Sequence, residues 1–156
     1  MKITVLLENN PQKERPDLEA EFGLSLHIQL DGQQILFDSG KSEMFARNAA
    51  KLGVHLEEVD AAVLSHHHYD HAGGLAAFLR LNAKAPVYLR KISDEGAYSR
   101  TLFRTHYAGL EKGLVERLAE RFRFVEERRE IAPGVFILTD IQKPYPMPSG
   151  NRVLFV

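Results

Sequence analysis

The chain has 156 residues, of which 44% are hydrophobic, and its 20 basic and 21 acidic residues leave a net charge of −1. This balance gives no electrostatic reason to expect nucleic acid or a membrane surface as a partner, and no apolar run approaches the length of a membrane span. Cysteine is absent, which excludes disulfides and cysteine–zinc sites. We expect a cytoplasmic location, with which the absence of cysteine is compatible. The length predicts a single domain over residues 1–156.

The N-terminal part of the chain predicts three strands. Ile3–Leu7 is a continuous apolar run, typical of a strand buried on both faces, and the polar segment Glu8–Asp17 predicts a loop. Apolar and polar residues alternate over residues 24–30, which indicates a strand with one polar face. Asp31-Gly32 is a hairpin turn signal, so Ile35–Phe37 is predicted to be the return strand.

Apolar residues at helical spacing predict three helices farther along the chain. They cover residues 44–52, the stretch around Leu75 and Phe78, and a stripe over residues 110–122. A buried strand is expected over Ala61–Leu64, and further strands over Val87–Leu89, Phe124–Val125 and Val135–Leu138. Residues 91–109 show no period, residues 142–152 predict a loop rich in proline, and Val153–Val156 is a further strand-like run.

A dense group of potential metal ligands follows the predicted strand at residues 61–64. The segment reads His66-His67-His68-Tyr69-Asp70-His71, and the pair Gly73-Gly74 comes directly after it. Side chains two residues apart in an extended segment point the same way, so His66 and His68 can converge on one ion. Asp70 and His71 can then face a second ion, and this donor set suits zinc, iron or manganese.

Explanations other than metal binding must be weighed separately for the clustered histidines and for the isolated ones. A histidine run can be a purification tag, but this one is internal and lies between a predicted strand and a predicted helix. His27, His55 and His106 stand alone, and for such residues a structural role is the better interpretation. Packing has no need for imidazoles and a carboxylate at this density, so the cluster favours metal binding.

Several segments together resemble the metallo-β-lactamase superfamily. Ser65–Gly74 looks like its H-x-H-x-D-H signature, and the resemblance extends to Ile35–Gly40, Val59–Leu64 and Ala132–Val135. Within the superfamily, the branch of dihydropterin-ribofuranosylaminobenzene phosphate synthase-like proteins is the most similar, judged by Leu7–Asn9, Ala20–Ser25 and Gly150–Arg152.

The resemblance implies an α/β fold, namely half of an αββα sandwich with one mixed sheet and helices on one face. It also implies that His66 and His68 ligate a first metal and that Asp70 and His71 ligate a second. Zinc is the expected ion, with iron or manganese as alternatives, and two ions are expected if the site is completed. Asp38 would orient a ligand histidine, although as a residue before Ser39-Gly40 it can also be a plain turn-former.

The implied function is metal-dependent hydrolysis of a small molecule. Metal-bound hydroxide would attack an ester, lactone, thioester or phosphoester, with Asp70 as the catalytic residue that orients the nucleophile. Substrate contacts are expected from Glu8–Asp17, from Tyr69 and from residues 91–109. A di-iron redox protein on the same fold is a rival, but such proteins place a carboxylate where His68 stands.

The chain departs from the family in its length. Family members are longer, and their second half supplies further metal ligands, whereas only His106 follows His71 here. We therefore expect the N-terminal half of the fold, and a poor hydrolase in isolation. The other alternative is an inactive half-domain that binds metal or a partner. A homodimer or strand exchange is expected to cover the exposed face of the sheet.

Overall fold

The computed structural model describes residues 1–91, 96–101, 104–139, 146 and 154–155. Its centre is a six-stranded mixed sheet in the order β1-β2-β3-β4-β5-β8. The first two pairings are antiparallel, and β3, β4, β5 and β8 run parallel. The strands are β1 (Lys2–Leu7), β2 (Ser25–Leu30), β3 (Gln33–Phe37), β4 (Ala61–Val63), β5 (Val87–Leu89) and β8 (Phe122–Phe124).

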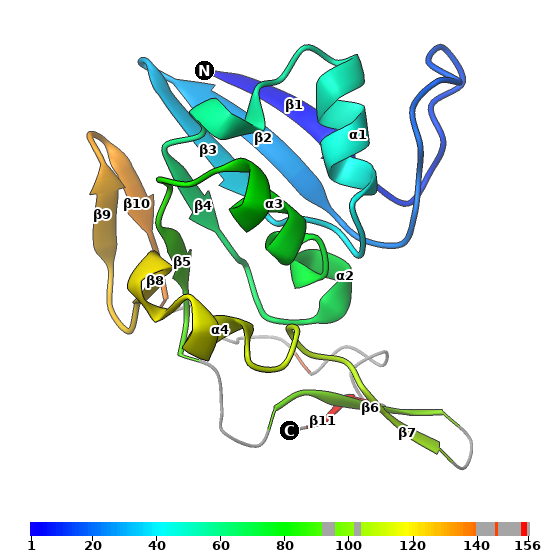
Figure 1. Cartoon of the computed structure of the whole chain (residues 1–156), viewed down its shortest axis with the longest axis vertical. Coiled ribbons are helices and arrows are strands. Elements are labelled where there is room, and N and C mark those ends of the chain that lie inside the picture. Colours follow the sequence, from blue (N-terminus) through cyan, green and yellow to red (C-terminus); the bar gives the residue numbers. More distant parts are fainter. Residues whose placement is uncertain (92–95, 102–103, 140–145, 147–153, 156) are drawn as a thin grey trace.

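Two helices cover one face of this sheet, α1 (Met44–Lys51) and α3 (Leu75–Leu81) (Figure 1). Phe45 of α1 and Phe78 of α3 are fully buried and pack in one core with Leu36 of β3. The buried amide of Asn48 donates to the carbonyl oxygen of Leu6 at 2.8 Å and so fastens α1 to the edge strand. The predicted fold class, one mixed sheet with helices on one face, is confirmed.

The β2–β3 hairpin turns at the predicted position. Asp31 has φ 49° and Gly32 has φ 84°, the two positive values that a tight type I′ turn requires. The turn sets the register that pairs Leu30 with Gln33.

The prediction that β1 is buried on both faces is wrong. Leu6 and Leu7 are buried, but Ile3 and Val5 are 50% and 49% exposed. The reason is topological, because β1 lies at the edge of the sheet and pairs only with β2. A continuous apolar run shows that a strand forms without showing where in the sheet it lies.

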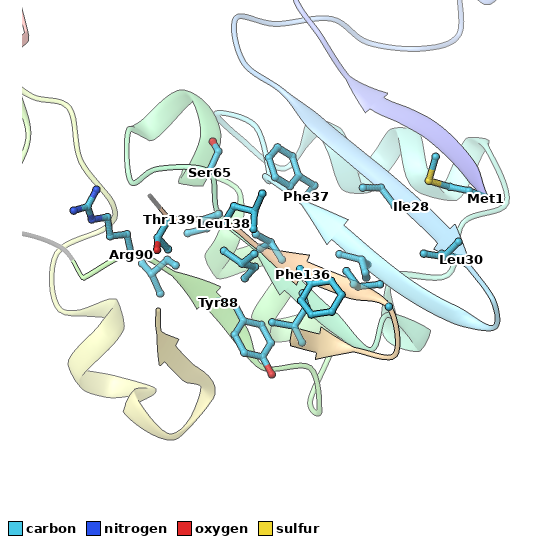
Figure 2. A pocket seen from close by; sticks show the side chains of 18 residues that line it. Met1, Ile28, Leu30, Phe37, Ser65, Tyr88, Arg90, Phe136, Leu138 and Thr139 are labelled. Carbon is cyan, nitrogen blue, oxygen red and sulfur yellow. The ribbon is translucent and has the colours of Figure 1, made fainter. Parts of the chain in front are cut away.

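Strand β2 turns its polar face toward the helices. Ser25 and His27 are buried. The hydroxyl of Ser25 donates to the carbonyl oxygen of Asp38 at 2.8 Å, and Nε2 of His27 lies 3.0 Å from the amide oxygen of Gln34, whereas Nδ1 of His27 is buried without a partner among the described residues. The alternate residues Ile28 and Leu30 lie on the other face, where they line a cavity of about 620 Å³ (Figure 2). The hairpin of β9 (Arg129–Ala132) and β10 (Val135–Ile137) forms the opposite wall of this cavity.

The helix predicted over residues 110–122 is mostly absent. Only α4 (Leu114–Arg117) is α-helical, followed by the short 3₁₀ turn η2 (Ala119–Arg121). Leu118 leaves the helical region, with φ −129° and ψ 37°, and Phe122 begins β8 instead. Pairing of Phe122 with Val87 in the parallel sheet outweighs the helical periodicity of this stripe.

Residues 91–109, which show no sequence period, contain a hairpin of β6 (Tyr98–Thr101) and β7 (Arg104–Tyr107). Strand β11 (Leu154–Phe155) pairs with β6, so part of the strand-like run at 153–156 is confirmed as a strand. The remaining helical turns are η1 (Leu56–Glu58) and α2 (Tyr69–Ala72). The loop predicted at 142–152 and the motif Gly150–Arg152 lie outside the described residues, apart from residue 146. Among the helices described, none has the length and apolar character needed to cross a membrane.

Candidate metal centre

The site forms where two neighbouring parallel strands end. Phe37 at the end of β3 pairs with Val63 at the end of β4, so the residues that follow both strands emerge at the same edge of the sheet. Asp38 follows β3, and Ser65 follows β4 by two positions. The two residues therefore meet, and the backbone N–H and hydroxyl of Ser65 donate to the two Asp38 carboxylate oxygens at 2.8 and 2.7 Å.

The single helical turn α2 brings the next ligands back over this edge. Its carboxyl end is fixed to the loop after β3, because the backbone N–H of Ser39 donates to the carbonyl oxygen of His71 at 2.7 Å. One potential ligand atom from each of His66, Asp70 and His71 lies within 4.8 Å of the others. The fold thus gathers two imidazoles and a carboxylate from a strand end and a helical turn.

Asp38 lies behind this group and is itself almost fully buried, at 1% exposure. Its Oδ2 lies 2.7 Å from Nδ1 of His71. Its backbone has φ 56°, in a region that residues other than glycine rarely adopt. Such a conformation costs on the order of 1–3 kcal/mol, and the hydrogen bonds from Ser65 and His71 hold it in place. The carboxylate is therefore within hydrogen-bond reach of a cluster histidine, as the sequence predicts, and its role toward a bound ion stays a prediction.

The hydrogen bonds define which ring nitrogens are free. The Asp38 carboxylate accepts in this contact, so Nδ1 of His71 is the donor and its Nε2 is left for a ligand. The single hydroxyl proton of Ser65 goes to Asp38, so its oxygen accepts from Nδ1 of His66 at 2.9 Å. Both histidines thus present Nε2, and that of His71 lies 3.4 Å from the Asp70 carboxylate.

The two histidines differ in their proton affinity. The hydrogen bond to Asp38 raises the pKa of His71, against the opposing effect of its partial burial. Burial, together with the neighbouring His71 and His68, lowers the pKa of His66 to about 4. His66 is therefore neutral at physiological pH and offers a lone pair without having to lose a proton.

His68 lies beside the group of three without belonging to it. Its ring centroid is 4.7 Å from that of His66. The predicted division into a His66–His68 pair and an Asp70–His71 pair stays a prediction, because the cluster in this structure joins one member of the first pair to both members of the second. The ring of His67 points inward, and its Nε2 is buried without a partner among the residues that the structure describes.

The isolated histidines do not join this cluster. His27 is buried under the helices, His55 is exposed beside Glu57, and His106 is exposed on β7. Of the predicted substrate contacts, Glu8 and its neighbour Asn9 line a small cavity that also reaches Asp70 and His71. Tyr98 and Tyr107 stack edge to face in their own hairpin, with centroids 5.6 Å apart, and Phe103 lies outside the described residues.

Sequence reasoning assigned no role to Ser65 or Phe22. Ser65 was visible as the residue that leads the histidine signature, but its link between His66 and Asp38 depends on the strand register. Phe22 lines the same small cavity as Glu8, and no sequence spacing connects it to the cluster. What draws attention to Phe22 is the 59% exposure of this large apolar residue, which only the structure reveals.

The donor set fits a divalent transition metal. Neutral imidazole nitrogens together with a carboxylate are the ligands that catalytic zinc sites use, with three protein ligands and an open position. A buried carboxylate behind a ligand histidine is the usual support for such a site. The α/β sheet thus presents, at the ends of its parallel strands, a group of residues that could hold a metal ion.

Comparison with known proteins places the chain in a family. The model of the metallo-β-lactamase superfamily matches residues 19–152, and the chain belongs to this superfamily. The solved structure of Tm1679, described as a metal-dependent hydrolase of the β-lactamase superfamily, superposes with a TM-score of 0.63 at 35% identity. That match covers 87% of this chain and 46% of the other.

Two relatives come from Methanocaldococcus jannaschii. One is an uncharacterized protein, 27% identical over 92% of this chain and 54% of its own length. The other is 7,8-dihydropterin-6-methyl-4-(β-D-ribofuranosyl)-aminobenzene-5′-phosphate synthase, 28% identical over 91% of this chain and 51% of its own length. The chain therefore spans about half the length of the relatives that it matches.

Proposed function

We propose that this chain carries the metal-binding centre of a hydrolase that acts on an ester, lactone, thioester or phosphoester of a small molecule. The observation that carries the proposal is the convergence of His66, Asp70 and His71 within 4.8 Å, in front of the buried Asp38 carboxylate. The name of the synthase relative adds pterin-containing compounds to the substrates worth testing.

The residues present have distinct tasks in this proposal. Nε2 of His66, Nε2 of His71 and the Asp70 carboxylate hold the ion, with His68 beside them as a further ligand. When bound, zinc would lower the pKa of its water to about 7 and polarise the substrate oxygen, and iron or manganese would act in the same way. Asp70 is the catalytic residue that orients the attacking water, and Asp38 keeps His71 in the tautomer that presents Nε2.

A metal-binding half-domain without turnover is the second candidate. It is favoured by the span of the chain, which is about half that of its relatives. The described residues contribute three clustered ligands and one neighbouring histidine, so further positions around the ion depend on water or on groups outside the described residues. A displacement of about 1 Å at a reacting centre can cost roughly a hundredfold in rate, and we therefore expect slow hydrolysis from these 156 residues alone.

The expected result is metal-dependent turnover that follows the cluster. The protein is freed of metal, reloaded with zinc or manganese, and assayed on a phosphodiester, a phosphomonoester, a lactone and a thioester. We expect slow hydrolysis of at least one substrate, its loss in Asp70→Ala, and its retention in His55→Ala, a matched change at an exposed histidine. Turnover that survives both a chelator and Asp70→Ala would contradict the proposed function, and zinc binding without any turnover would favour the half-domain.

We further propose that the protein self-associates through the sheet face opposite the helices. Met1, Phe136 and Leu138 are 84%, 42% and 63% exposed around the apolar cavity on that face (Figure 2). Light scattering at increasing concentration should show a dimer, and Phe136→Asp should shift it toward the monomer, whereas Tyr107→Asp, on another hairpin, should leave it unchanged. A monodisperse monomer at high concentration would refute self-association.

A further inference from the structure

A small recess opens beside the metal cluster. It has a volume of about 280 Å³ and is lined by Glu8 and Asn9 after β1, by residues 22–24 before β2, and by Asp70 and His71. This volume is just below the usual range for ligand sites, about 300–1,000 Å³, which suits one small ring system rather than a whole drug-sized molecule. A molecule bound in the recess would therefore touch two of the three clustered ligands.

The recess has an aromatic wall whose position is fixed. Phe22 is 59% exposed, yet the residues on both sides of it are anchored. The Glu21 carboxylate accepts from the backbone N–H and the hydroxyl of Ser42, both at 2.9 Å, and the N–H of Gly23 donates to Asn9 Oδ1 at 2.9 Å. The ring is thus presented to solvent by a segment that is hydrogen-bonded to neighbouring loops on either side.

This segment also lies directly against the helical turn that carries the ligands. A Cβ atom on Gly23 would overlap the carbonyl oxygen of Asp70, and Gly23 has φ 145°, a value that other residues rarely adopt. The backbone N–H of Leu24 points at the same carbonyl oxygen at 3.4 Å. The distance between the Phe22 segment and Asp70 is therefore set by backbone contact.

The polar lining of the recess selects for hydrogen-bond donors. One carboxylate oxygen of Glu8 accepts from the Asn10 amide at 3.1 Å, and the other accepts no hydrogen bond from the residues that the structure describes. Glu8 and Asp70 give the lining two carboxylates, and it contains no lysine or arginine among those residues. An aromatic face beside a carboxylate suits a planar ring that carries N–H groups, whereas an anion would be repelled.

We propose that this recess is a substrate-binding subsite for a planar nitrogen heterocycle, stacked on Phe22 and hydrogen-bonded through its N–H groups to Glu8. Its role as a substrate subsite rests on the proposed hydrolase function, because only then does the rest of the molecule extend over Asp70 and His71 to the reacting position. Phe22 and Glu8 would set which substrates are accepted, and neither holds the metal.

Pterin is a suitable probe, since it is planar, carries N–H groups on one edge and is itself fluorescent, while the chain contains no tryptophan to interfere. Titration of the full chain should quench pterin fluorescence to saturation, with and without added zinc. Loss of ring stacking in Phe22→Ala should weaken binding by about tenfold or more, and Phe22→Tyr should restore it. Glu8→Gln should weaken pterin binding while leaving the thermal unfolding temperature unchanged.

Two controls make the result specific. Phe136→Ala removes a second exposed aromatic ring, on the opposite face of the sheet, and should bind pterin as the unaltered chain does. Benzoate, an aromatic anion without N–H groups, should not compete. The proposal is overturned if pterin does not bind, if Phe22→Ala and Glu8→Gln bind it normally, or if Phe136→Ala is equally impaired. Pterin binding that depends on Phe22 in a chain without hydrolytic activity would sustain the subsite and contradict only the proposed function.

Discussion

Replacing Asp38 with asparagine is expected to lower zinc affinity by about 10- to 100-fold, the usual effect of removing a carboxylate behind a ligand histidine. The asparagine is nearly isosteric and can still accept from the Ser65 backbone N–H. Its NH₂ group, however, would face Nδ1 of His71, where Oδ2 now accepts at 2.7 Å. His71 would then favour the tautomer with its proton on Nε2, the nitrogen needed by the metal.

The measurement is a zinc titration by calorimetry, accompanied by the ¹⁵N chemical shifts of the His71 ring, which identify the protonated nitrogen. Asp31→Asn is the matched control, since Asp31 also has a positive φ, of 49°, but lies in the β2–β3 turn. It should bind zinc normally. Unchanged zinc affinity in Asp38→Asn, with the protein folded, would show that Asp38 is only a turn residue.

The largest loss of stability is expected from Gly74→Ala. A Cβ atom at this position would overlap the carbonyl oxygen of Ser39 and lie 2.6 Å from both Ser42 O and Phe45 Cε1. Two of these atoms are backbone and the third belongs to a fully buried ring, so no flexible group can move aside. Overpacking of this kind costs about 3 kcal/mol, which corresponds to a fall of roughly 6–12 °C in Tm for a chain of this size.

Gly53→Ala is the control that separates the cost of steric overlap from the cost of a left-handed backbone conformation. Gly53 has φ 69° but nothing lies within 4 Å of a Cβ built on it, so alanine there should cost only the left-handed conformation, about 1–2 kcal/mol. Thermal unfolding of both variants tests the difference. Gly74→Ala should also weaken zinc binding, because it displaces the loop that holds His71, whereas Gly53→Ala should not. Equal Tm values for the two variants would contradict the contact argument.

The elements that the sequence predicted correctly are those with local causes. The Asp31-Gly32 turn depends on two residues that tolerate positive φ, and α1 and α3 depend on apolar residues at helical spacing. Strand β4 is apolar throughout and lies in the middle of the sheet, where a continuous apolar run belongs. None of these features requires knowledge of a distant partner.

The sequence-based predictions were wrong where a residue distant in the sequence determines the local structure. Ile3 and Val5 are half exposed because β1 has a neighbour on one side only, which no local pattern encodes. Phe122 joins a strand because Val87 is there to pair with it. The ligand cluster was found because its members are consecutive, and Asp38 was found by resemblance. The bridge through Ser65 and the position of Phe22 beside Asp70 follow from strand register and loop packing.

The adjacency of β3 and β4 has a consequence for how this protein can diversify. Asp38, Ser65, His66, Asp70 and His71 all belong to one strand–helix–strand crossover and the helical turn that follows it. The recess shares Asp70 and His71 with this stretch, but the rest of its wall comes from other segments, the residues after β1 and those before β2. The clustered residues and Asp38 are therefore encoded by one continuous stretch of chain, whereas Glu8 and Phe22 lie outside it. Substitution at Glu8 or Phe22 can therefore alter the surface of the recess and leave the clustered residues themselves unchanged.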